Sequence, residues 1–267
     1  MENSRSSVLV VDNDHVFQEY ARLFFESRGF RVVTADSGLA ALNALEKDPV
    51  DLLVTDLVMP NIDGATLCRI IRGEPAWMNI QLVVVSATAK EAFEDLLSIG
   101  ADVYIAKGPL VQMGQHLEKA LEMLESGVED GGSVLGMEAV HSRRITRELL
   151  WENRQLLSVI DGMSEGVIIL SKDGRVIRIN DAARRLLGFR DTRVLGQRVG
   201  DLVTGLFGND QPEGTLFSHN GFHLDVCYSD VEGDDHAVST VILRDLTAEH
   251  VARERLVAVG IGPLMPV

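Results

Sequence analysis

Hydrophobic and polar positions alternate on two scales along the first 125 residues. Short apolar runs of strand length are separated by longer segments in which apolar residues recur every three or four positions. The apolar runs occupy residues 8–11, 30–34, 52–55, 81–85 and 102–105. Such alternation is typical of parallel strands joined by crossover helices. We therefore predict an N-terminal α/β domain with a doubly wound, five-stranded parallel sheet.

Helical periodicity fills the segments between these runs, at residues 17–28, 39–46, 66–72, 93–99 and 110–124. Gly29, Gly73 and Gly100 follow three of them. Because glycine tolerates positive φ, we expect a left-handed residue to end each of these helices.

The pattern changes after residue 125. Residues 126–136 have the sequence SGVEDGGSVLG, a Gly-rich and acidic stretch that predicts a linker with little buried surface. Residues 137–161 contain neither Pro nor Gly, and with Met163 they place five apolar residues on one helical stripe that Glu152 interrupts. The stripe consists of Ile145, Leu149, Leu156, Val159 and Met163. It fits a short dimeric coiled coil and equally a helix that caps its own domain.

Short strands separated by turns follow from Gly166 onward. They are expected at residues 167–170, 175–179, 216–219, 222–228 and 236–243. Asn220-Gly221 between two of these runs is a strong hairpin signal. We predict an α+β domain with an antiparallel sheet, and divide the chain into a first domain at 1–125, a linker and connecting helix at 126–155, a second domain at 156–250, and a C-terminal helix and tail at 251–267.

Polar residues gather where the strands of the first domain end. Asp12, Asn13 and Asp14 follow the first strand. The third, fourth and fifth strands end at or next to Asp56, Ser86 and Lys107. In an open parallel sheet, reactive groups collect at the carboxyl ends of the strands. Several carboxylates beside one lysine predict a site for a hard divalent cation such as Mg²⁺, and for phosphoryl transfer to Asp56.

At these positions the chain resembles the response-regulator receiver family over roughly its first 125 residues. The matching elements are Val10-Val11-Asp12, the run DLVMPNIDG from Asp56 to Gly64, Ser86-Ala87, and the run GADVYIAK from Gly100 to Lys107. The resemblance implies a flavodoxin-like fold and two-component signalling.

The same resemblance assigns roles to individual residues. Asp56 would accept a phosphoryl group from a histidine kinase or phosphotransfer protein. Ser86 would hydrogen-bond that group, Lys107 would pair with it, and Tyr104 would turn inward as a switch. The Mg²⁺ ligands would be Asp12, Asn13, Asp56 and the backbone carbonyl of Val58.

Two positions depart from the family pattern. Asn13 replaces a second acidic residue, which is expected to weaken Mg²⁺ binding unless its amide carbonyl or Asp14 substitutes. Gly108 separates Lys107 from Pro109, whereas the family usually has proline directly after the lysine. The loop that carries Lys107 is therefore expected to be set differently.

The second half resembles the PAS family over residues 156–249. The matching segments are IDGMSEGVIIL at 160–170, DGRVIRINDAA at 173–183, LLG at 186–188 and VILRDLT at 241–247. PAS domains share a shape but not a ligand, and no local residue indicates one here. Cys227, His219 and His223 lack the spacing of haem, flavin or metal ligands, so we expect no PAS cofactor.

Charge and hydropathy narrow the partners. The formal net charge of −15 disfavours nucleic acid, whose binding depends on basic residues. No apolar stretch reaches membrane-spanning length, so we expect no membrane insertion and a cytoplasmic protein.

The leading hypothesis is a phosphorylation-dependent interaction protein that forms a homodimer through the PAS domain and the connecting helix. The first alternative is an enzyme, a hybrid histidine kinase or a fragment of one. These 267 residues contain no recognisable phosphorylated-histidine box or ATP-binding domain, so enzymatic activity is not expected. The second alternative is a PAS ligand sensor in which the receiver is only a docking platform.

Overall fold

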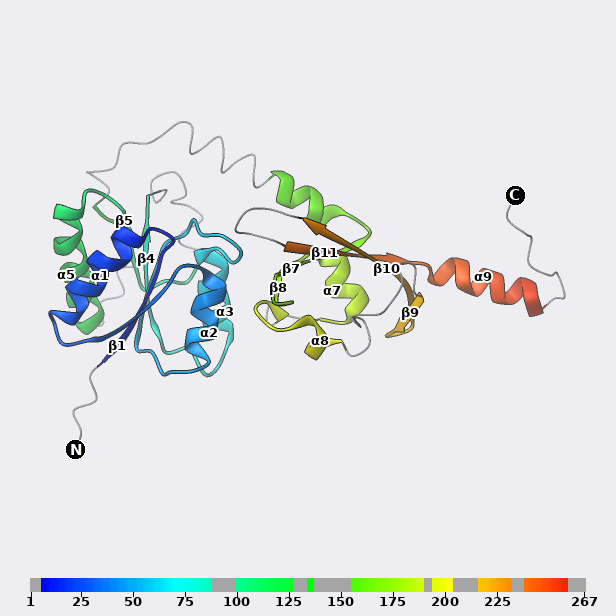
Figure 1. Cartoon of the computed structure of the whole chain (residues 1–267), viewed down its shortest axis with the longest axis horizontal. Coiled ribbons are helices and arrows are strands. Elements are labelled where there is room, and N and C mark those ends of the chain that lie inside the picture. Colours follow the sequence, from blue (N-terminus) through cyan, green and yellow to red (C-terminus); the bar gives the residue numbers. More distant parts are fainter. Residues whose placement is uncertain are drawn as a thin grey trace. The chain divides into compact units, whose positions relative to one another are not determined.

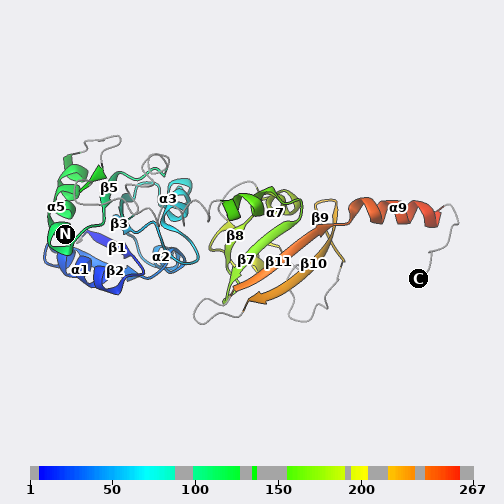
Figure 2. The same cartoon turned by 90° about the horizontal axis from the view of Figure 1, so that it is seen from above.

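The computed structural model describes residues 6–87, 99–126, 134–136, 155–189, 194–203, 216–231 and 238–258. The chain divides into two compact units, Met1–Glu152 and Asn153–Val267 (Figures 1 and 2). Within the described residues, no helix combines the length and the apolar character that crossing a membrane requires.

The first unit is built on a parallel sheet with the strand order β2-β1-β3-β4-β5-β6. Its strands are β1 (Ser7–Val11), β2 (Arg31–Ala35), β3 (Leu52–Thr55), β4 (Gln81–Ser86), β5 (Val103–Ala106) and β6 (Val134–Leu135). Every residue of β1, β3 and β5 is buried, as expected for central strands covered on both faces. The α/β prediction is confirmed.

The sixth strand corrects the sequence prediction, which counted five strands and placed residues 134 and 135 in a linker with little buried surface. Val134 pairs with Tyr104 and Leu135 with Ile105. Leu135 is only 8% exposed and joins the core. Two apolar residues in a Gly-rich stretch are too short for a strand signal, but the open edge of β5 offers them unpaired backbone groups.

The described helices of this unit are α1 (His15–Glu26), α2 (Gly38–Leu45), α3 (Gly64–Gly73) and α5 (Leu110–Ser126). The side chains of Asp14, Ser37 and Asp63 accept hydrogen bonds from the first amides of α1, α2 and α3. The predicted helix at residues 93–99 lies outside the described residues, apart from Ile99.

The predicted left-handed residue is found at two of the three glycines, although of these two only Gly29 follows a described helix. Gly29 and Gly100 have φ values of 87° and 80°. The prediction for Gly73 is wrong, because this residue is the last of α3 and the chain leaves the helix through an extended Glu74 at φ −100° and ψ 116°. Pro75 explains the difference, since a proline disfavours helical backbone in the residue before it.

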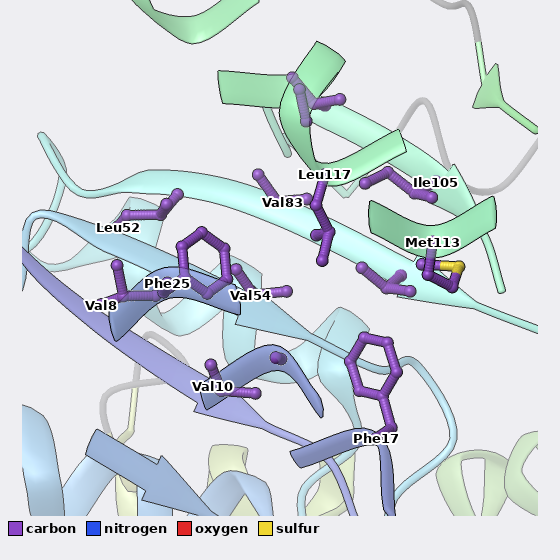
Figure 3. Close-up of a cluster of buried hydrophobic side chains, with 14 of the residues drawn as sticks. Val8, Val10, Phe17, Phe25, Leu52, Val54, Val83, Ile105, Met113 and Leu117 are labelled. Carbon is purple, nitrogen blue, oxygen red and sulfur yellow. The ribbon is translucent and has the colours of Figure 1, made fainter. Parts of the chain in front are cut away.

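One hydrophobic core fills the space between the sheet and the α1 and α5 side (Figure 3). Phe17 and Phe25 of α1 and Leu117 of α5 are almost completely buried against alternate residues of the strands. Alternation along a strand sends the remaining strand residues to the opposite face of the sheet. The sheet is therefore held from both sides, and its strand ends are fixed relative to one another.

The second unit contains an antiparallel sheet with the order β8-β7-β11-β10-β9, as predicted for an α+β domain. Its strands are β7 (Gly166–Ser171), β8 (Val176–Ile179), β9 (Leu216–His219), β10 (Phe222–Val231) and β11 (Val238–Asp245). Its helices include α7 (Asp181–Leu187), α8 (Val199–Leu202) and α9 (Thr247–Ala258). Asn220 and Gly221 have φ values of 50° and 84°, which confirms the predicted hairpin turn.

Asn180 ties the start of this unit together and is fully buried. Its Oδ1 accepts from the amides of Val167 and Ala183, at 2.8 and 2.9 Å. Its Nδ2 donates to the carbonyls of Ile160 and Glu165, both at 2.9 Å. The side chain therefore caps α7 and also joins the helix at residues 155–162 to β7.

The helix at residues 155–162 leaves part of its apolar stripe uncovered within this chain. Leu156 and Val159 are each 67% exposed, and Met163 just beyond the helix is 36% exposed. The other predicted members of the stripe, at positions 145 and 149, lie outside the described residues.

Candidate functional site

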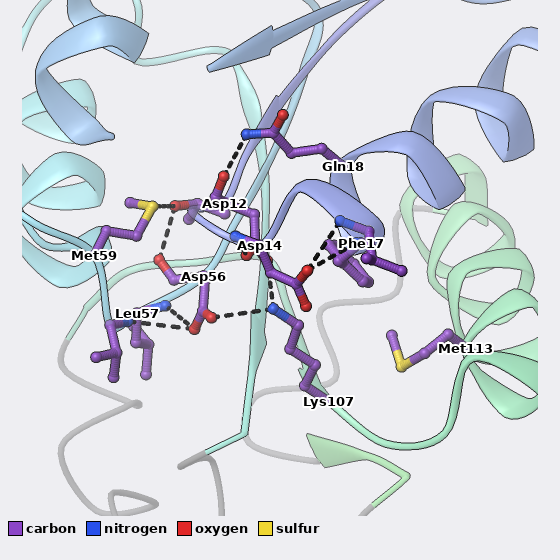
Figure 4. A network of polar contacts seen from close by, with 12 residues as sticks. Asp12, Asp14, Phe17, Gln18, Asp56, Leu57, Met59, Lys107 and Met113 are labelled. Atoms are coloured by element: carbon purple, nitrogen blue, oxygen red, sulfur yellow. Dashed lines mark hydrogen bonds and ion pairs between the residues drawn. The ribbon is translucent and has the colours of Figure 1, made fainter. Parts of the chain in front are cut away.

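Four strand ends bring the predicted site residues to one edge of the first sheet. Asp12 directly follows β1, Asp56 follows β3, Ser86 ends β4, and Lys107 follows β5. Because β1, β3, β4 and β5 are successive neighbours in the sheet, these residues lie at one edge. Figure 4 shows Asp12, Asp56 and Lys107 side by side. The carboxyl edge of the sheet thus carries two acids, a hydroxyl and an amine.

An ammonium group bridges the two carboxylates. The Nζ atom of Lys107 lies 2.7 Å from Oδ2 of Asp12 and 3.3 Å from Oδ2 of Asp56. Asp12 is completely buried and Asp56 is 8% exposed. The Lys107 ammonium also lies 4.7 Å from the centre of the Phe17 ring, within range of a cation–π interaction. Lys107 therefore reaches both acids although Gly108 separates it from Pro109.

The backbone after β3 fixes the Asp56 carboxylate. Its Oδ1 accepts from the amides of Leu57 at 2.6 Å and Val58 at 3.3 Å. The amide of Gly64 donates to the carbonyl of Leu57, at 3.1 Å. A Cβ on Gly64 would lie 1.9 Å from the carbonyl oxygen of Asp56, so only glycine lets α3 begin so close to the acid.

Asp12 is held from both its side chain and its backbone. Its Oδ1 accepts from the amide of Asp14 at 2.8 Å, and its carbonyl accepts from the side-chain amide of Gln18. The Gln18 amide also donates to the carbonyl of Ala35 at 3.1 Å and so ties β1 to the end of β2. Sequence reasoning missed Gln18. The available signal was a polar residue next to Phe17 on the inner stripe of α1.

Burial and unequal charge perturb the ionisation of this cluster. Burial raises the pKa of Asp12, and the neighbouring charge of Asp56 adds to this, although the hydrogen bond from Lys107 opposes it. Burial tends to lower the pKa of Lys107, but the charges of Asp56 and Asp12 outweigh it and the pKa is raised. Two carboxylates and one ammonium leave a net negative charge in a poorly solvated place.

This excess charge suits a divalent cation with oxygen ligands. Asp12 and Asp56 supply two carboxylates, while the described residues hold no group of three or more His, Cys, Asp or Glu side chains arranged for a metal. Asn13 is exposed beside Asp12, and Val58 follows two residues after Asp56. Asp14 is committed in part elsewhere, because its Oδ1 caps α1 through the Val16 amide at 2.9 Å. The residues present fit Mg²⁺ with a reduced set of protein carboxylates.

Ser86 and Tyr104 lie inside the domain behind these groups. Ser86 is fully buried, and its carbonyl accepts from the amide of Lys107 at 2.9 Å. Tyr104 is 6% exposed, and its hydroxyl accepts from the amide of Ala101 at 3.2 Å. Burial raises the pKa of Tyr104. The tyrosine side chain is therefore buried, with its hydroxyl against the backbone that precedes β5.

The other residues considered from the sequence lie apart from this cluster. Cys68 is buried in α3, where burial raises the pKa of its thiol to about 12, and Cys227 is half-buried in β10. His219 and His223 lie on opposite strands of the Asn220-Gly221 hairpin. The His223 ring stacks on the His250 ring of α9, with centroids 4.0 Å apart.

Comparisons with known proteins agree with this arrangement. The response regulator receiver domain matches residues 8–121, and a PAS domain matches residues 154–220. A probable transcriptional regulatory protein of Picosynechococcus is 32% identical over 113 residues, which cover 39% of this chain and 44% of that protein. The transcriptional regulatory protein CseB of Streptomyces coelicolor is 35% identical over 104 residues, covering 39% of this chain and 43% of that protein.

Among solved structures, the response regulator TrrA of Thermotoga maritima, in complex with Mg²⁺ and BeF, is 25% identical. The alignment covers 45% of this chain and 98% of that one, with a TM-score of 0.40. The chain spans less than half the length of the first two curated relatives. The two family models each match within one of the folded units, and the chain carries a response regulator receiver domain followed by a PAS domain.

Proposed function

We propose that this chain is a phospho-accepting protein of a two-component system and that Asp56 takes a phosphoryl group from a histidine kinase or phosphotransfer protein. The observation that carries the proposal is the Lys107 ammonium shared between the buried carboxylates of Asp12 and Asp56. A positive group fixed beside a carboxylate lowers the repulsion that an incoming phosphoryl group meets.

The transfer exchanges one bond for another. A carboxylate oxygen of Asp56 forms a bond to phosphorus as the phosphorus–nitrogen bond of a phosphohistidine breaks. The electron pair of that bond stays on the imidazole nitrogen, which takes up a proton. The amides of Leu57 and Val58 hold Asp56 in place, while the Lys107 ammonium pairs with the developing negative charge.

Mg²⁺ would be held by Asp12, Asp56, the Asn13 side chain and the Val58 carbonyl. When bound, the cation neutralises the oxygens of the transferred group. With Asn13 in place of a second acid, this chain would bind Mg²⁺ more weakly than a site with three carboxylates.

Phosphorylation would then change the domain surface through Ser86 and Tyr104. Ser86 would donate a hydrogen bond to the phosphoryl group, and the inward position of Tyr104 would be favoured when Ser86 is drawn towards Asp56. Tyr104 already occupies a buried position in this structure. Phosphorylation would thus shift an equilibrium towards a conformation that the unphosphorylated chain can adopt.

The PAS unit would serve as the output or dimerisation module. The exposed side chains of Leu156, Val159 and Met163 form an apolar stripe on and just after the helix at residues 155–162, and a second copy of the same helix is its proposed partner. We propose no PAS cofactor and no catalytic activity. The net charge of −15 supports the further expectation that the chain does not bind nucleic acid. This stays a prediction, because two of the relatives are described as transcriptional regulatory proteins.

Phosphotransfer tests the proposal directly. Candidate histidine kinases labelled with radioactive ATP should transfer label to the wild type and not to Asp56→Asn, because an amide has no carboxylate oxygen to attack phosphorus. Asp48→Asn, which removes an exposed carboxylate of the same unit, should behave as wild type. Label incorporated from ATP without a kinase would support the hybrid-kinase alternative, and equal labelling of wild type and Asp56→Asn would refute Asp56 as acceptor.

Magnesium should stabilise the folded receiver in a pH-dependent way. At a concentration about 100 times its Kd, an ion that binds only the folded state adds about 2.7 kcal/mol to the free energy of unfolding. Because the pKa of Asp12 is raised, its charge destabilises the metal-free fold above the folded pKa, and this cost vanishes below the unfolded pKa. As the pH falls, Asp12 takes up its proton at a higher pH than an ordinary aspartate does, and a protonated carboxyl binds Mg²⁺ poorly. The stabilisation by Mg²⁺ should therefore fade at a higher pH than it would with an ordinary aspartate as ligand.

Calorimetry with and without Mg²⁺ from about pH 4 to 8 checks this. The range covers about four units above the usual pKa of an aspartate, where a raised pKa becomes visible. Asp12→Asn should lose most of the Mg²⁺-induced rise in Tm, and Asp48→Asn should keep it. An equal rise in Asp12→Asn and wild type would show that the ion binds elsewhere.

Dimerisation is tested on the exposed stripe. Replacing Leu156 and Val159 together by Glu should shift the chain to a monomer, because charge repulsion and desolvation oppose an apolar helix contact. Sedimentation velocity over a concentration series measures the change. Ser158→Glu, an exposed position of the same helix off the stripe, is the matched control. If the double variant keeps the oligomeric state of the wild type, this stripe is not the interface.

A further inference from the structure

We propose that strand β6, Val134–Leu135, is an intramolecular docking segment that couples the phosphorylation site to the chain leaving the first unit. The inference rests on the proposed function, because it concerns the regulation of the same site. The docked strand occupies the open edge of β5 and lies beside Tyr104. It belongs to the stretch that the sequence alone presents as a linker.

The register places Val134 against the switch residue. Tyr104 pairs with Val84 of β4 on one side and with Val134 of β6 on the other. Ile105 and Leu135 both join the core on the α1 and α5 side, so alternation puts Tyr104 and Val134 together on the opposite face. Val134 therefore stands on the edge side of Tyr104, where an outward-turning ring would have to pass.

Besides the pairing with β5, two contacts among the described residues hold the strand. Leu135 is 8% exposed and packs into the core that includes Met113 and Leu117. Gly136 follows with a φ of 78°, and a Cβ built there would lie 2.5 Å from Cε1 of His116 on α5. Glycine suits this position for two reasons: the φ is positive, and a Cβ would fit only if the His116 ring moved.

A strand of two residues that depends on one buried leucine and one glycine has a docking equilibrium that other parts of the domain can shift. Docking favours the buried Tyr104, and the proposed function assigns that same position to the phosphorylated state. Each event must then favour the other by the same factor, since the coupling of two equilibria is reciprocal. Phosphorylation of Asp56 would tighten β6, and release of β6 would weaken phosphoryl binding.

Gly136→Ala in the full chain tests this proposal. The added methyl group should clash with His116 and undock the strand. Gly29→Ala is the matched control, because Gly29 has a similar φ of 87° but no atom within 4 Å of the built Cβ. The double variant His116→Ala with Gly136→Ala should restore part of the docking, because it removes the ring that the methyl group meets but keeps the strain of an alanine at positive φ.

Two quantities are measured for each variant. Hydrogen exchange reports protection of the β5 and β6 amides, and titration with beryllofluoride and Mg²⁺, a phosphoryl mimic, reports affinity through the Leu57 and Val58 amide resonances. Gly136→Ala should lose β6 protection and bind the mimic more weakly, by a factor of about 5 or more. Gly29→Ala should stay close to wild type in both measurements, and the double variant should lie between Gly136→Ala and wild type.

The outcomes separate this proposal from the proposed function. If the wild type binds the mimic and Gly136→Ala loses β6 protection without a change of affinity, the coupling is refuted while the proposed function stands. Unchanged protection in Gly136→Ala refutes the role of the Gly136–His116 contact. A wild type that does not respond to the mimic refutes the proposed function, and the coupling with it.

Discussion

The first unit depends on one electrostatic constraint, a single ammonium group that must serve two buried carboxylates. Lys107 reaches Asp12 and Asp56 only because β1, β3 and β5 run parallel in one sheet and end at the same edge. The surrounding residues fix those ends: Gly64 lets α3 start against the backbone of Asp56, and Gln18 ties the backbone after β1 to β2. The core between the sheet and α1 and α5 holds the strands in register.

This arrangement lowers the stability of the fold and keeps charged groups together at the site. Burying an acid whose charge is only partly balanced costs folding free energy, and the raised pKa of Asp12 expresses that cost. Electrostatic costs of this kind concentrate at functional sites, because the charge of a group that binds a cation or a phosphoryl group is fully balanced only in the bound state. The same reasoning explains why the site lies at the strand ends, where loops can bring in partners, and not within the sheet.

The sequence predicted most of the site, because strand ends can be located from apolar runs and a parallel sheet brings such ends together. That rule alone places Asp12, Asp56, Ser86 and Lys107 at the same edge of the sheet. Gln18 could not be assigned in this way, because its contacts are to backbone carbonyls of Asp12, which follows β1, and Ala35, which ends β2. β6 was missed for a related reason: two residues carry no periodicity, and their strand forms only because β5 has an open edge. At Gly73, the proline two residues later outweighed the glycine signal.

The central claim is that Asp56 carries the phosphoryl group. Treating the phosphorylated chain with borohydride reduces an acyl phosphate to an alcohol, so mass spectrometry of the peptide containing residue 56 locates the modified residue. The account predicts homoserine at position 56 in the wild type after incubation with a phosphorylated histidine kinase, and only when Mg²⁺ is present. Homoserine at another aspartate, or none in a chain that has demonstrably taken up phosphate, would contradict it.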